Sequence, residues 1–457
     1  MNFAEKKILV CGMARSGQSA AALLCGLGAT VTAQDLNKNI NWDYDPTEKG
    51  MTLYLGHNPD RIIHEFDLVV ISPGISIYLP FIEKAKVLGI PVWGEAELAF
   101  RLCPCPVIGI TGTNGKTTVT SLVGEILSRY NPKTVVAGNI GIPLTSMVQG
   151  LTPDSIVVAE ISSFQLETAV NFRPNISAVL NMTPDHLDRH KNMSTYIEMK
   201  SRIFQNQRHP DIAVLNYDNP ITQAMTPPCQ IVWFSENSEL DNGVYLRGGN
   251  IYARLGAYQA GNTSAGAVTH QVEHFIASLD GVNIITENAL AATALALCAG
   301  ASPEHIAKGL KAFENVPHRL EHVASIGGVD YINDSKATNP NAAVKGLESI
   351  SKPIVLIGGG YDKSADFSPW IEAFKGKVVQ LILIGQTAPK IIAACWEKGF
   401  AAFRQAQTLQ EAVEIATQIA TPGQAVLLSP ACASFDMFKD YEERGDVFKA
   451  CIVGTRL

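Results

Sequence analysis

The chain has 457 residues, of which 46% are apolar and 17% charged, with a formal net charge of −7. This composition is typical of globular domains and excludes a disordered chain, and the absence of a basic block argues against nucleic acid or an anionic membrane as the main partner. The length suggests about three domains, each large enough for its own core.

The lack of a recognisable targeting segment and the cysteine usage both favour the cytoplasm. No stretch approaches the run of about 18 apolar residues that a membrane span needs, and the first residues lead into a strand without a signal-like segment. The nine cysteines are scattered and odd in number, and Cys103-Pro-Cys105 lacks zinc-knuckle spacing. We therefore expect a reduced cytoplasmic protein, and a monomer.

The first segment, residues 1–95, alternates short strands (8–11, 29–33, 68–71) with helical stretches such as 17–27, which predicts a parallel sheet wrapped by helices. The turn from Gly12 to Gly17, followed by Asp35, imitates a dinucleotide fingerprint, but Ala14 replaces its middle glycine. Nicotinamide binding is therefore weakly supported. The alternatives are another anionic ligand, with Asp35 accepting from a hydroxyl, or a bare turn.

The second segment starts with a glycine-rich loop, Gly109-Ile-Thr-Gly-Thr-Asn-Gly-Lys-Thr-Thr118, between a strand (107–110) and a helix (119–130). Such a turn points backbone N–H groups at phosphates, with Lys116 as the counter-charge and the Thr117 hydroxyl as a Mg²⁺ ligand. Ile110 stands where the usual pattern has glycine. A glycine-rich turn without a ligand is the alternative, but the context predicts ATP binding.

Two further strands, 156–160 and 176–180, end in polar residues: Glu160 ends the first, and Asn181 to Asp188, with His186, follows the second. Because ligands gather beyond the carboxyl ends of parallel strands, we expect a shared metal role at the phosphates. Taken singly, Glu160 would be a solvated acid and His186 a structural histidine.

From about 212 to 280 the pattern changes to short alternating segments (231–234, 244–247, 250–253) with turn signals at 241–243 and 247–250, which predict antiparallel hairpins. Residues 256–270 are small and polar and predict an exposed loop. Residues 287–301 predict an alanine-rich helix whose apolar face serves packing.

The third segment, about 302–457, returns to strands (353–357, 379–384, 425–428) alternating with helices. Polar clusters at 317–321, 333–339 and 429–438 lie at element ends, where loops carry chemistry.

Together these motifs resemble the Mur ligase family. The resemblance rests on residues 111–118, Gly138-Asn-Ile-Gly141, 159–167, Asp185-His-Leu-Asp188 and Pro317-His-Arg319, and covers essentially the whole chain. Residues 72–75, 333–339 and 429–445 resemble the branch that adds D-glutamate. The implied fold class is α/β with a Rossmann-like N-terminal domain (1–95), a central P-loop ATPase domain with an antiparallel β insertion (96–301) and a Rossmann-like C-terminal domain (302–457).

The resemblance implies an ATP-dependent amide ligase. ATP would phosphorylate the carboxylate of UDP-N-acetylmuramoyl-L-alanine, and the amine of D-glutamate would attack the acyl phosphate. Phosphate is a far better leaving group than hydroxide, so the acid is activated first, and catalysis is mostly positioning and charge neutralisation. Two Mg²⁺ ions are implied.

The resemblance also implies roles for individual residues. For catalysis these are Lys116, Glu160, His186 and Lys200. For ATP they are Gly112, Thr113, Asn114, Gly115, Lys116, Thr117, Thr118, Asn139, Asn288, Arg319, Asp334 and Lys336, with Asp334 suited to a ribose hydroxyl. The first Mg²⁺ would be held by Thr117 and Glu160 and the second by His186 and Lys200, with the lysine carbamylated.

The substrates that are joined would bind at the two ends of the chain. The UDP-sugar would contact Arg15, Ser16, Asp35, Ser72, Gly74, Asn139 and His186. D-glutamate would contact Thr338, Lys363, Ser434, Phe435 and Tyr441.

The chain departs from the family pattern at two places. The family's His-Asn pair ahead of Asn288 is absent, because Asn283 lies five residues before it, so the adenine contact there is open. Asp362 is shifted by one from a common family form and is not assigned. Without the resemblance, Lys200 would be taken for an exposed helical lysine.

Three rival functions are less consistent with the sequence. A regulatory NTPase is disfavoured by the dense polar clusters at strand ends, and a dehydrogenase rests on the first domain alone. A folate-polyglutamate synthase shares the phosphate loop but begins directly at its ATP domain, so the N-terminal segment counts against it.

Overall fold

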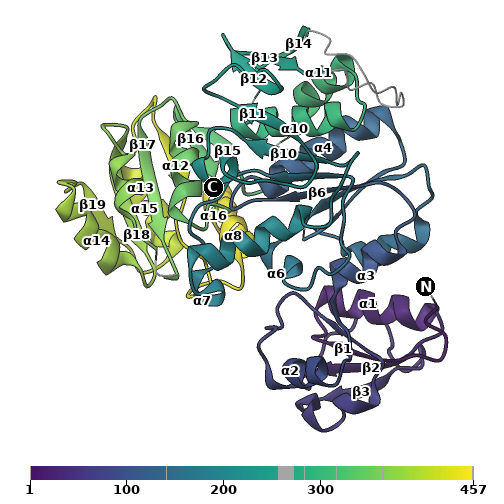
Figure 1. Cartoon of the computed structure of the whole chain (residues 1–457). Helices are drawn as coiled ribbons and strands as arrows, with labels where there is room; N and C mark the ends of the chain where they lie inside the picture. The colour runs from purple at the N-terminus through teal and green to yellow at the C-terminus, as the bar shows by residue number, and fades with distance from the viewer. Residues whose placement is uncertain are drawn as a thin grey trace. The chain divides into compact units, whose positions relative to one another are not determined.

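The computed structural model describes residues 2–139, 141–255, 272–282, 284–314, 316–362 and 365–454, and the backbone alone of Asp188. The chain forms two compact units (Figure 1). Met1–Met182, Ser194–Val282 and Thr286–Phe313 make up the first, whereas Thr183–Met193 and Glu314–Leu457 make up most of the second.

The N-terminal part of the first unit is a five-stranded, wholly parallel sheet in the order β3-β2-β1-β4-β5. Its strands are β1 (Lys7–Cys11), β2 (Thr30–Asp35), β3 (Thr52–Leu55), β4 (Leu68–Ile71) and β5 (Val92–Gly94), and its helices α1 (Arg15–Gly26), α2 (Pro80–Val87) and α3 (Glu95–Leu102). Helix α1 starts two residues earlier than predicted. It follows a turn at Gly12 (φ +86°), and Gly17 fits because a Cβ there would lie 1.8 Å from the Gly12 oxygen.

The rest of the first unit is built on a nine-stranded sheet in the order β14-β13-β12-β11-β10-β9-β6-β8-β7. Its parallel strands are β6 (Val107–Thr111), β7 (Thr134–Gly138), β8 (Ile156–Glu160), β9 (Ile176–Val179), β10 (Ile212–Asn216) and β11 (Gln230–Ser235). In this arrangement β6 lies between β8 and β9, so the loops after these three strands meet at one edge of the sheet.

The predicted antiparallel segment is partly wrong. Strands β12 (Gly243–Arg247), β13 (Asn250–Arg254) and β14 (Glu273–Ser278) do pair antiparallel, but β11 runs parallel to both β10 and β12. Alternation of apolar residues marks a half-buried strand without revealing the direction of its neighbours. The predicted exposed loop at 256–270 lies outside the described residues.

Helices α4 (Lys116–Tyr130), α10 (Thr286–Cys298) and α11 (Pro303–Ala312) pack together in this unit. Helix α10 is buried on nearly all sides, as expected of a helix that is apolar all round, so its predicted packing role is confirmed. The short helices are α5 (Leu144–Met147), α6 (Ser163–Leu166), α8 (Met193–Ser201) and α9 (Pro220–Gln223).

The second unit is built on a six-stranded sheet in the order β15-β16-β20-β17-β18-β19, in which β15 alone pairs antiparallel. The strands are β15 (Glu321–Ile326), β16 (Val329–Asn333), β17 (Ile354–Gly359), β18 (Val378–Ile384), β19 (Phe403–Gln405) and β20 (Ala425–Leu428). The helices are α7 (Leu187–His190), α12 (Pro340–Glu348), α13 (Ser368–Glu372), α14 (Ala388–Glu397), α15 (Leu409–Ile419) and α16 (Tyr441–Gly454). The strands predicted at 353–357, 379–384 and 425–428 correspond to β17, β18 and β20.

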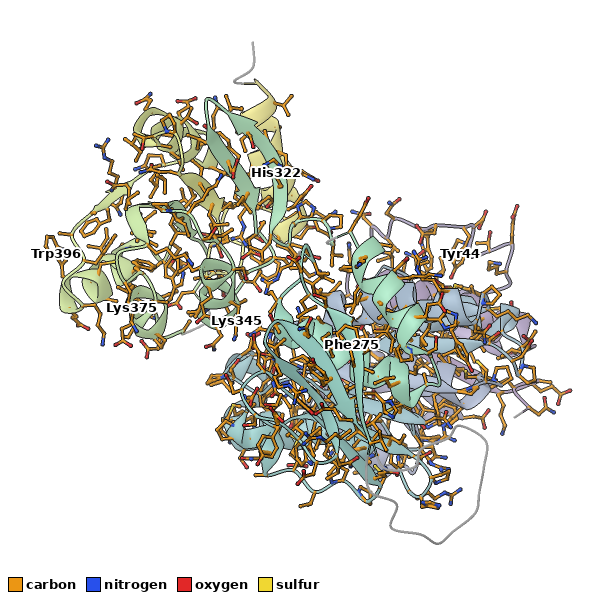
Figure 2. The ribbon with its side chains drawn as sticks, turned by 90° about the horizontal axis from the view of Figure 1, so that it is seen from above. Tyr44, Phe275, His322, Lys345, Lys375 and Trp396 are labelled. Carbon is orange, nitrogen blue, oxygen red and sulfur yellow. The ribbon has the colours of Figure 1, made fainter. Side chains whose placement is uncertain are left out.

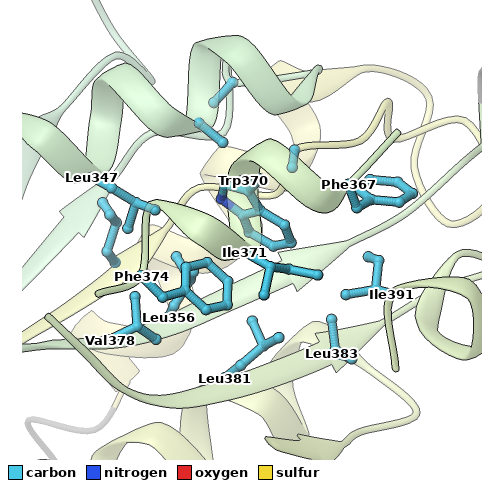
Figure 3. Packing of buried hydrophobic residues seen from close by; sticks show 14 of the residues in the cluster. Leu347, Leu356, Phe367, Trp370, Ile371, Phe374, Val378, Leu381, Leu383 and Ile391 are labelled. Atoms are coloured by element: carbon cyan, nitrogen blue, oxygen red, sulfur yellow. The ribbon is translucent and has the colours of Figure 1, made fainter. Parts of the chain in front are cut away.

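One side of this sheet carries a core centred on the buried Trp370, with Leu356, Phe374 and Leu381 among its neighbours (Figure 3). The backbone of β17 approaches the indole closely, since a Cβ at Gly358 would lie 2.5 Å from Trp370. In contrast, Trp396 on α14 is exposed and projects from the surface (Figure 2). Within the described residues, no helix combines the length and apolarity needed to cross a bilayer.

Candidate active site

The glycine-rich loop joins β6 to α4, as predicted. Gly112 (φ +152°) and Gly115 (φ +82°) have backbone conformations that L side chains rarely adopt, and Gly115 leads into the first turn of α4. The Lys116 Nζ donates to the carbonyl oxygens of Gly112 (3.0 Å) and Thr113 (2.8 Å). The ammonium group therefore lies over the loop, beside the N-terminal end of a helix that favours anions.

Asn181, two residues after the end of β9, holds this loop in place. Its Oδ1 accepts from the Asn114 N–H (2.9 Å), its backbone oxygen accepts from the Thr113 N–H (3.0 Å), and its Nδ2 donates to Glu287 Oε1 (2.7 Å). Neither Asn181 nor Glu287 was predicted individually to contact this loop. Their signal was present, because Asn181 begins a polar run at a strand end.

Asn288, predicted to contact ATP, packs against the same loop. The side chain is buried, and a Cβ added to Gly115 would lie 2.4 Å from the Asn288 Oδ1. The structure thus brings Asn288 to the phosphate loop, while Asn283 lies outside the described residues.

Glu160 is a buried carboxylate at the end of β8. Its Oε1 accepts from Asn139 Nδ2 (2.9 Å), and its Oε2 is buried without a hydrogen-bond partner among the described residues. The reading of Glu160 as a solvated acid is therefore wrong. A buried anionic oxygen without a donor fits a cation ligand, because leaving it unpaired costs free energy.

Lys200 on α8 is also buried, at 2% exposure, so the default reading of an exposed lysine is wrong. Its Nζ donates to the Gly112 oxygen (2.8 Å) and to Thr111 Oγ1 (3.3 Å), and lies 4.9 Å from the ring centre of Tyr196. The Tyr196 hydroxyl in turn contacts Thr113 Oγ1 (3.3 Å). Lys116 and Lys200 thus approach the phosphate loop from two helices.

His186 belongs to the second unit and caps α7 with a left-handed backbone (φ +53°). Its Nε2 lies 3.6 Å from Asp185 Oδ2, and Asp185 is the more buried of the two side chains. Among the described residues, no three His, Cys, Asp or Glu side chains form a metal-binding cluster of their own.

The polar clusters of the second unit come together at the ends of β16 and β20. Arg319 Nη1 contacts Asp334 Oδ1 (3.1 Å), and Ser429 Oγ donates to Asp334 Oδ2 (2.8 Å). Asp334 is fully buried, and burial raises its carboxyl pKa while Arg319 opposes that change. Protein donors therefore engage both oxygens of Asp334, and its ribose contact stays a prediction.

Lys336 and Tyr441 form a neighbouring pair. Lys336 Nζ donates to the Tyr441 hydroxyl (3.0 Å) and lies 4.9 Å from the centre of its ring. A residue predicted to bind ATP is thereby joined to one predicted to bind D-glutamate.

Arg444, for which no role was predicted, joins these loops. Its guanidinium donates to Ser335 Oγ (2.9 Å), the Ser335 carbonyl oxygen (2.8 Å) and the carbonyl oxygens of Cys432 (3.1 Å) and Ala433 (3.3 Å). The side chain is 1% exposed, and burial lowers its pKa to about 10. Backbone carbonyls thus stabilise a buried cation that fixes two loops.

A cavity of about 340 Å³ opens in the second unit. Its lining includes Asp185, His186, Thr338, Asn339 and Tyr361. Of the predicted D-glutamate residues, Thr338 lines the cavity and Ser434 is buried. Phe435 is exposed, and its ring packs edge-on against that of Tyr361, with the ring centres 6.4 Å apart. Lys363 lies outside the described residues.

Five of the predicted UDP-sugar residues follow or end β1, β2 and β4: Arg15, Ser16, Asp35, Ser72 and Gly74. Of the other two, Asn139 follows β7 and His186 belongs to the second unit. Ser72 Oγ donates to the Gly12 oxygen (2.6 Å), and Arg15 Nη1 donates to the Gly141 oxygen (3.3 Å). The Asp35 carboxylate accepts from the N–H groups of Met13 (2.7 Å) and Asn37 (2.8 Å), so it also orders the turn around it. Arg15 and Gly74 are exposed and Ser16 is half-buried.

Family models match three consecutive parts of the chain. They are the Mur ligase MurD-like N-terminal domain at residues 6–94, the Mur ligase middle domain at 110–296, and the Mur ligase glutamate ligase domain at 318–432. The models therefore span nearly the whole chain in one order.

Similar proteins match over their full length. A UDP-N-acetylmuramoylalanine–D-glutamate ligase of Pelotomaculum thermopropionicum is 44% identical over 100% of this chain and 99% of its own. The protein of the same name from a Thermoanaerobacter species is 43% identical over 100% of both chains.

Solved structures share the fold at low identity. MurC of Thermotoga maritima, a UDP-N-acetylmuramate-alanine ligase, is 18% identical with a TM-score of 0.59 over 99% of this chain and 100% of its own. MurF of Thermotoga maritima in complex with ADP is 14% identical with a TM-score of 0.57 over 99% of this chain and 96% of its own. The predicted three-domain α/β fold is confirmed, and the chain belongs to the Mur ligase family of ATP-dependent ligases.

Proposed function

We propose that this chain joins D-glutamate to UDP-N-acetylmuramoyl-L-alanine at the expense of ATP, through an acyl phosphate, in cytoplasmic synthesis of peptidoglycan precursors. Relatives that carry this name at 42–44% identity over the full chain support the choice of substrates. The observation that supports the chemistry is the phosphate loop. Two lysines, the half-buried Lys116 and the buried Lys200, both donate hydrogen bonds to its backbone.

Lys116 neutralises the transferred phosphate. Its ammonium group donates to two loop carbonyls, which are neutral acceptors. A phosphate oxygen is charged and forms a stronger hydrogen bond, so it replaces them. The residues from Gly112 to Thr118 supply the backbone donors around it, and Asn181 keeps them in position.

Glu160 and Thr117 hold the first Mg²⁺. Glu160 fits this role because its Oε2 is buried without a donor among the described residues. Mg²⁺ takes few protein ligands and completes its shell with phosphate oxygens and water, which suits a site without a larger acidic cluster. When bound, the ion neutralises charge on the phosphates. A second ion would use His186 and carbamylated Lys200.

The second unit supplies the remaining ATP contacts and the D-glutamate site. Arg319 and Lys336 offer charge to phosphate oxygens, and Asp334, which pairs with Arg319, stays the predicted contact of a ribose hydroxyl. The cavity beside Thr338 is the proposed place of D-glutamate, and Ser434, Phe435, Tyr441 and Lys363 stay its other predicted contacts. The amine of D-glutamate then attacks the acyl phosphate, and the tetrahedral intermediate collapses to amide and phosphate.

The UDP-sugar is assigned to the first sheet, at Arg15, Ser16, Asp35, Ser72 and Gly74, with Asn139 and His186 near its reacting end. The exposed Arg15 and Gly74 are accessible to a ligand, and the turn that Asp35 and Ser72 order opens a helix. The expected species is a monomer, which sedimentation velocity at assay concentration measures.

Phosphate release tests the proposal. The purified protein with Mg²⁺-ATP is given UDP-N-acetylmuramoyl-L-alanine, D-glutamate, or both, and a panel of other amino acids replaces D-glutamate. We expect rapid release with the complete set alone, and mass spectrometry of the product should show one added glutamyl group.

Two outcomes would contradict this function. Equal release without any acceptor would indicate a regulatory NTPase, and preference for another amino acid would move the chain to another branch. The remaining alternative is a folate-polyglutamate synthase, because FolC of Escherichia coli shares the fold (TM-score 0.56, 16% identity). It is tested by a further reaction in which a folate replaces the nucleotide-sugar. The Lys116→Ala variant is the control for contaminating ATPases.

A further inference from the structure

Two thiols face each other at the junction between the two sheets of the first unit. Cys103 follows the last residue of α3, and β6 begins two residues after Cys105. The Sγ atoms of Cys103 and Cys105 are 3.6 Å apart, both residues are half-buried, and neither is in a disulfide.

The local sequence explains this approach. Cys103 has an extended backbone (φ −71°, ψ 121°), and residues i and i+2 of an extended segment point to the same side. Pro104 between them has a fixed φ, which restricts the segment further. The two side chains therefore meet without any long-range contact.

We propose that Cys103 and Cys105 form a dithiol modification site that low-molecular-weight disulfides oxidise to an intramolecular disulfide. This inference is independent of the ligase function.

The reaction balances as two thiol–disulfide exchanges. The Cys103 thiolate attacks one sulfur of the small disulfide, forms a mixed disulfide and releases one small thiolate. Cys105 then attacks the Cys103 sulfur, the bond to the small molecule breaks, and a second small thiolate leaves. The cysteines lose two electrons and two protons, and the small disulfide becomes two thiols.

Electrostatics favour this order. Burial, and next the charge of Cys103, raise the pKa of Cys105 to about 12, so Cys105 keeps its proton at the first step. In the mixed disulfide, the Cys103 sulfur can no longer repel a thiolate on Cys105, so the second cause of the raised pKa is removed. Cys105 then becomes a better nucleophile beside the sulfur that it attacks.

Accessibility distinguishes the pair from the four buried cysteines. Cys11, Cys298, Cys395 and Cys432 are buried, where a small disulfide reaches them slowly. Disulfides in reducing compartments are transient, and exposed ones are readily reduced, so this site would respond reversibly to oxidising conditions.

The sequence offers a direct test. Trypsin cleavage after Arg101 and Lys116 yields one peptide, 102–116, that contains Cys103 and Cys105 and no other cysteine. The full-length protein is treated with oxidised glutathione, its free thiols are alkylated, and the digest is analysed without reduction. We expect this peptide to be unalkylated and lighter by two hydrogen atoms, and dithiothreitol to restore both thiols.

Single variants separate ring closure from simple adduct formation. Cys105→Ser should trap the glutathione adduct at Cys103, whereas Cys25→Ser should close the ring like the parent protein. Two alkylated cysteines in peptide 102–116, or a stable glutathione adduct in the parent protein, would each overturn the proposal. Because the readout is peptide mass, an inactive ligase would not affect it.

Discussion

The side chain of Asn288 covers the α-carbon of Gly115, so that a β-carbon on Gly115 would lie 2.4 Å from Asn288 Oδ1. This contact ties the start of α10 to the turn that opens α4. Any side chain at residue 115 must displace Asn288 or shift the loop.

Gly115→Ala should therefore lower stability by about 1–3 kcal/mol, because φ is +82° and the new methyl group collides with Asn288. ATP binding should weaken as the loop moves, as measured by calorimetry alongside urea unfolding. Gly50→Ala is the matched control, since Gly50 has φ +71° but a methyl group there would meet no atom within 4 Å. Equal losses in the two variants would show that the Asn288 contact is unimportant.

Lys116→Ala should lower kcat by at least about 10²–10³-fold, because one preorganised charge on the transferred phosphate is lost. The melting temperature should change little, since within the described residues the hydrogen bonds of Lys116 Nζ go to loop carbonyls. Lys133→Ala, which removes an exposed ion pair with Asp154, is the control. Near-normal product formation by Lys116→Ala would refute its role.

Lys200→Ala should be inactive and partly recover activity with acetate or another short carboxylic acid. The reason is that a carboxylate can occupy the place of a carbamate in the buried site that the lysine leaves. The recovery is read as product formed against acid concentration, and Lys116→Ala should show none under the same conditions. Without recovery in Lys200→Ala, carbamylation of Lys200 loses its support.

His318 should make the second unit less stable in acid. Burial, and next Lys449, lower its pKa below the ordinary value of 6.5. The unfolded chain therefore binds more protons between the folded pKa and 6.5, and the stability contributed by neutral His318 is present above this window and lost as pH falls through it.

Urea unfolding between pH 7.5 and about 5 measures this dependence. His318→Asn should flatten the pH dependence, and asparagine tolerates the left-handed backbone at this position (φ +64°). His322→Asn, at an exposed site, should leave the dependence unchanged. An unchanged slope in His318→Asn would contradict the assignment.

The local features of the fold were predictable because they depend on neighbouring residues. The glycine turn before α4, the carboxylate at the end of β8 and the apolar α10 all follow from short patterns. The parallel direction of β11 was not predictable, because pairing is a long-range property.

Burial was the other property that the sequence did not reveal. Lys200 and Arg444 have charged side chains that usually face water, and each donates to a backbone carbonyl far away along the chain, that of Gly112 and that of Ser335. Asn181 was visible as the start of a polar run, but its contact with Asn114 depends on β6 and β9 being neighbours.

The burial of Arg444 also restricts how this part of the molecule can vary in evolution. Its carbonyl partners belong to stretches about a hundred residues apart, and lengthening or shortening either one would strand a positive charge away from water. Insertions and deletions among relatives should therefore avoid both stretches. They should accumulate in surface turns such as Gly327-Gly328, whose carbonyls are not among the partners of Arg444.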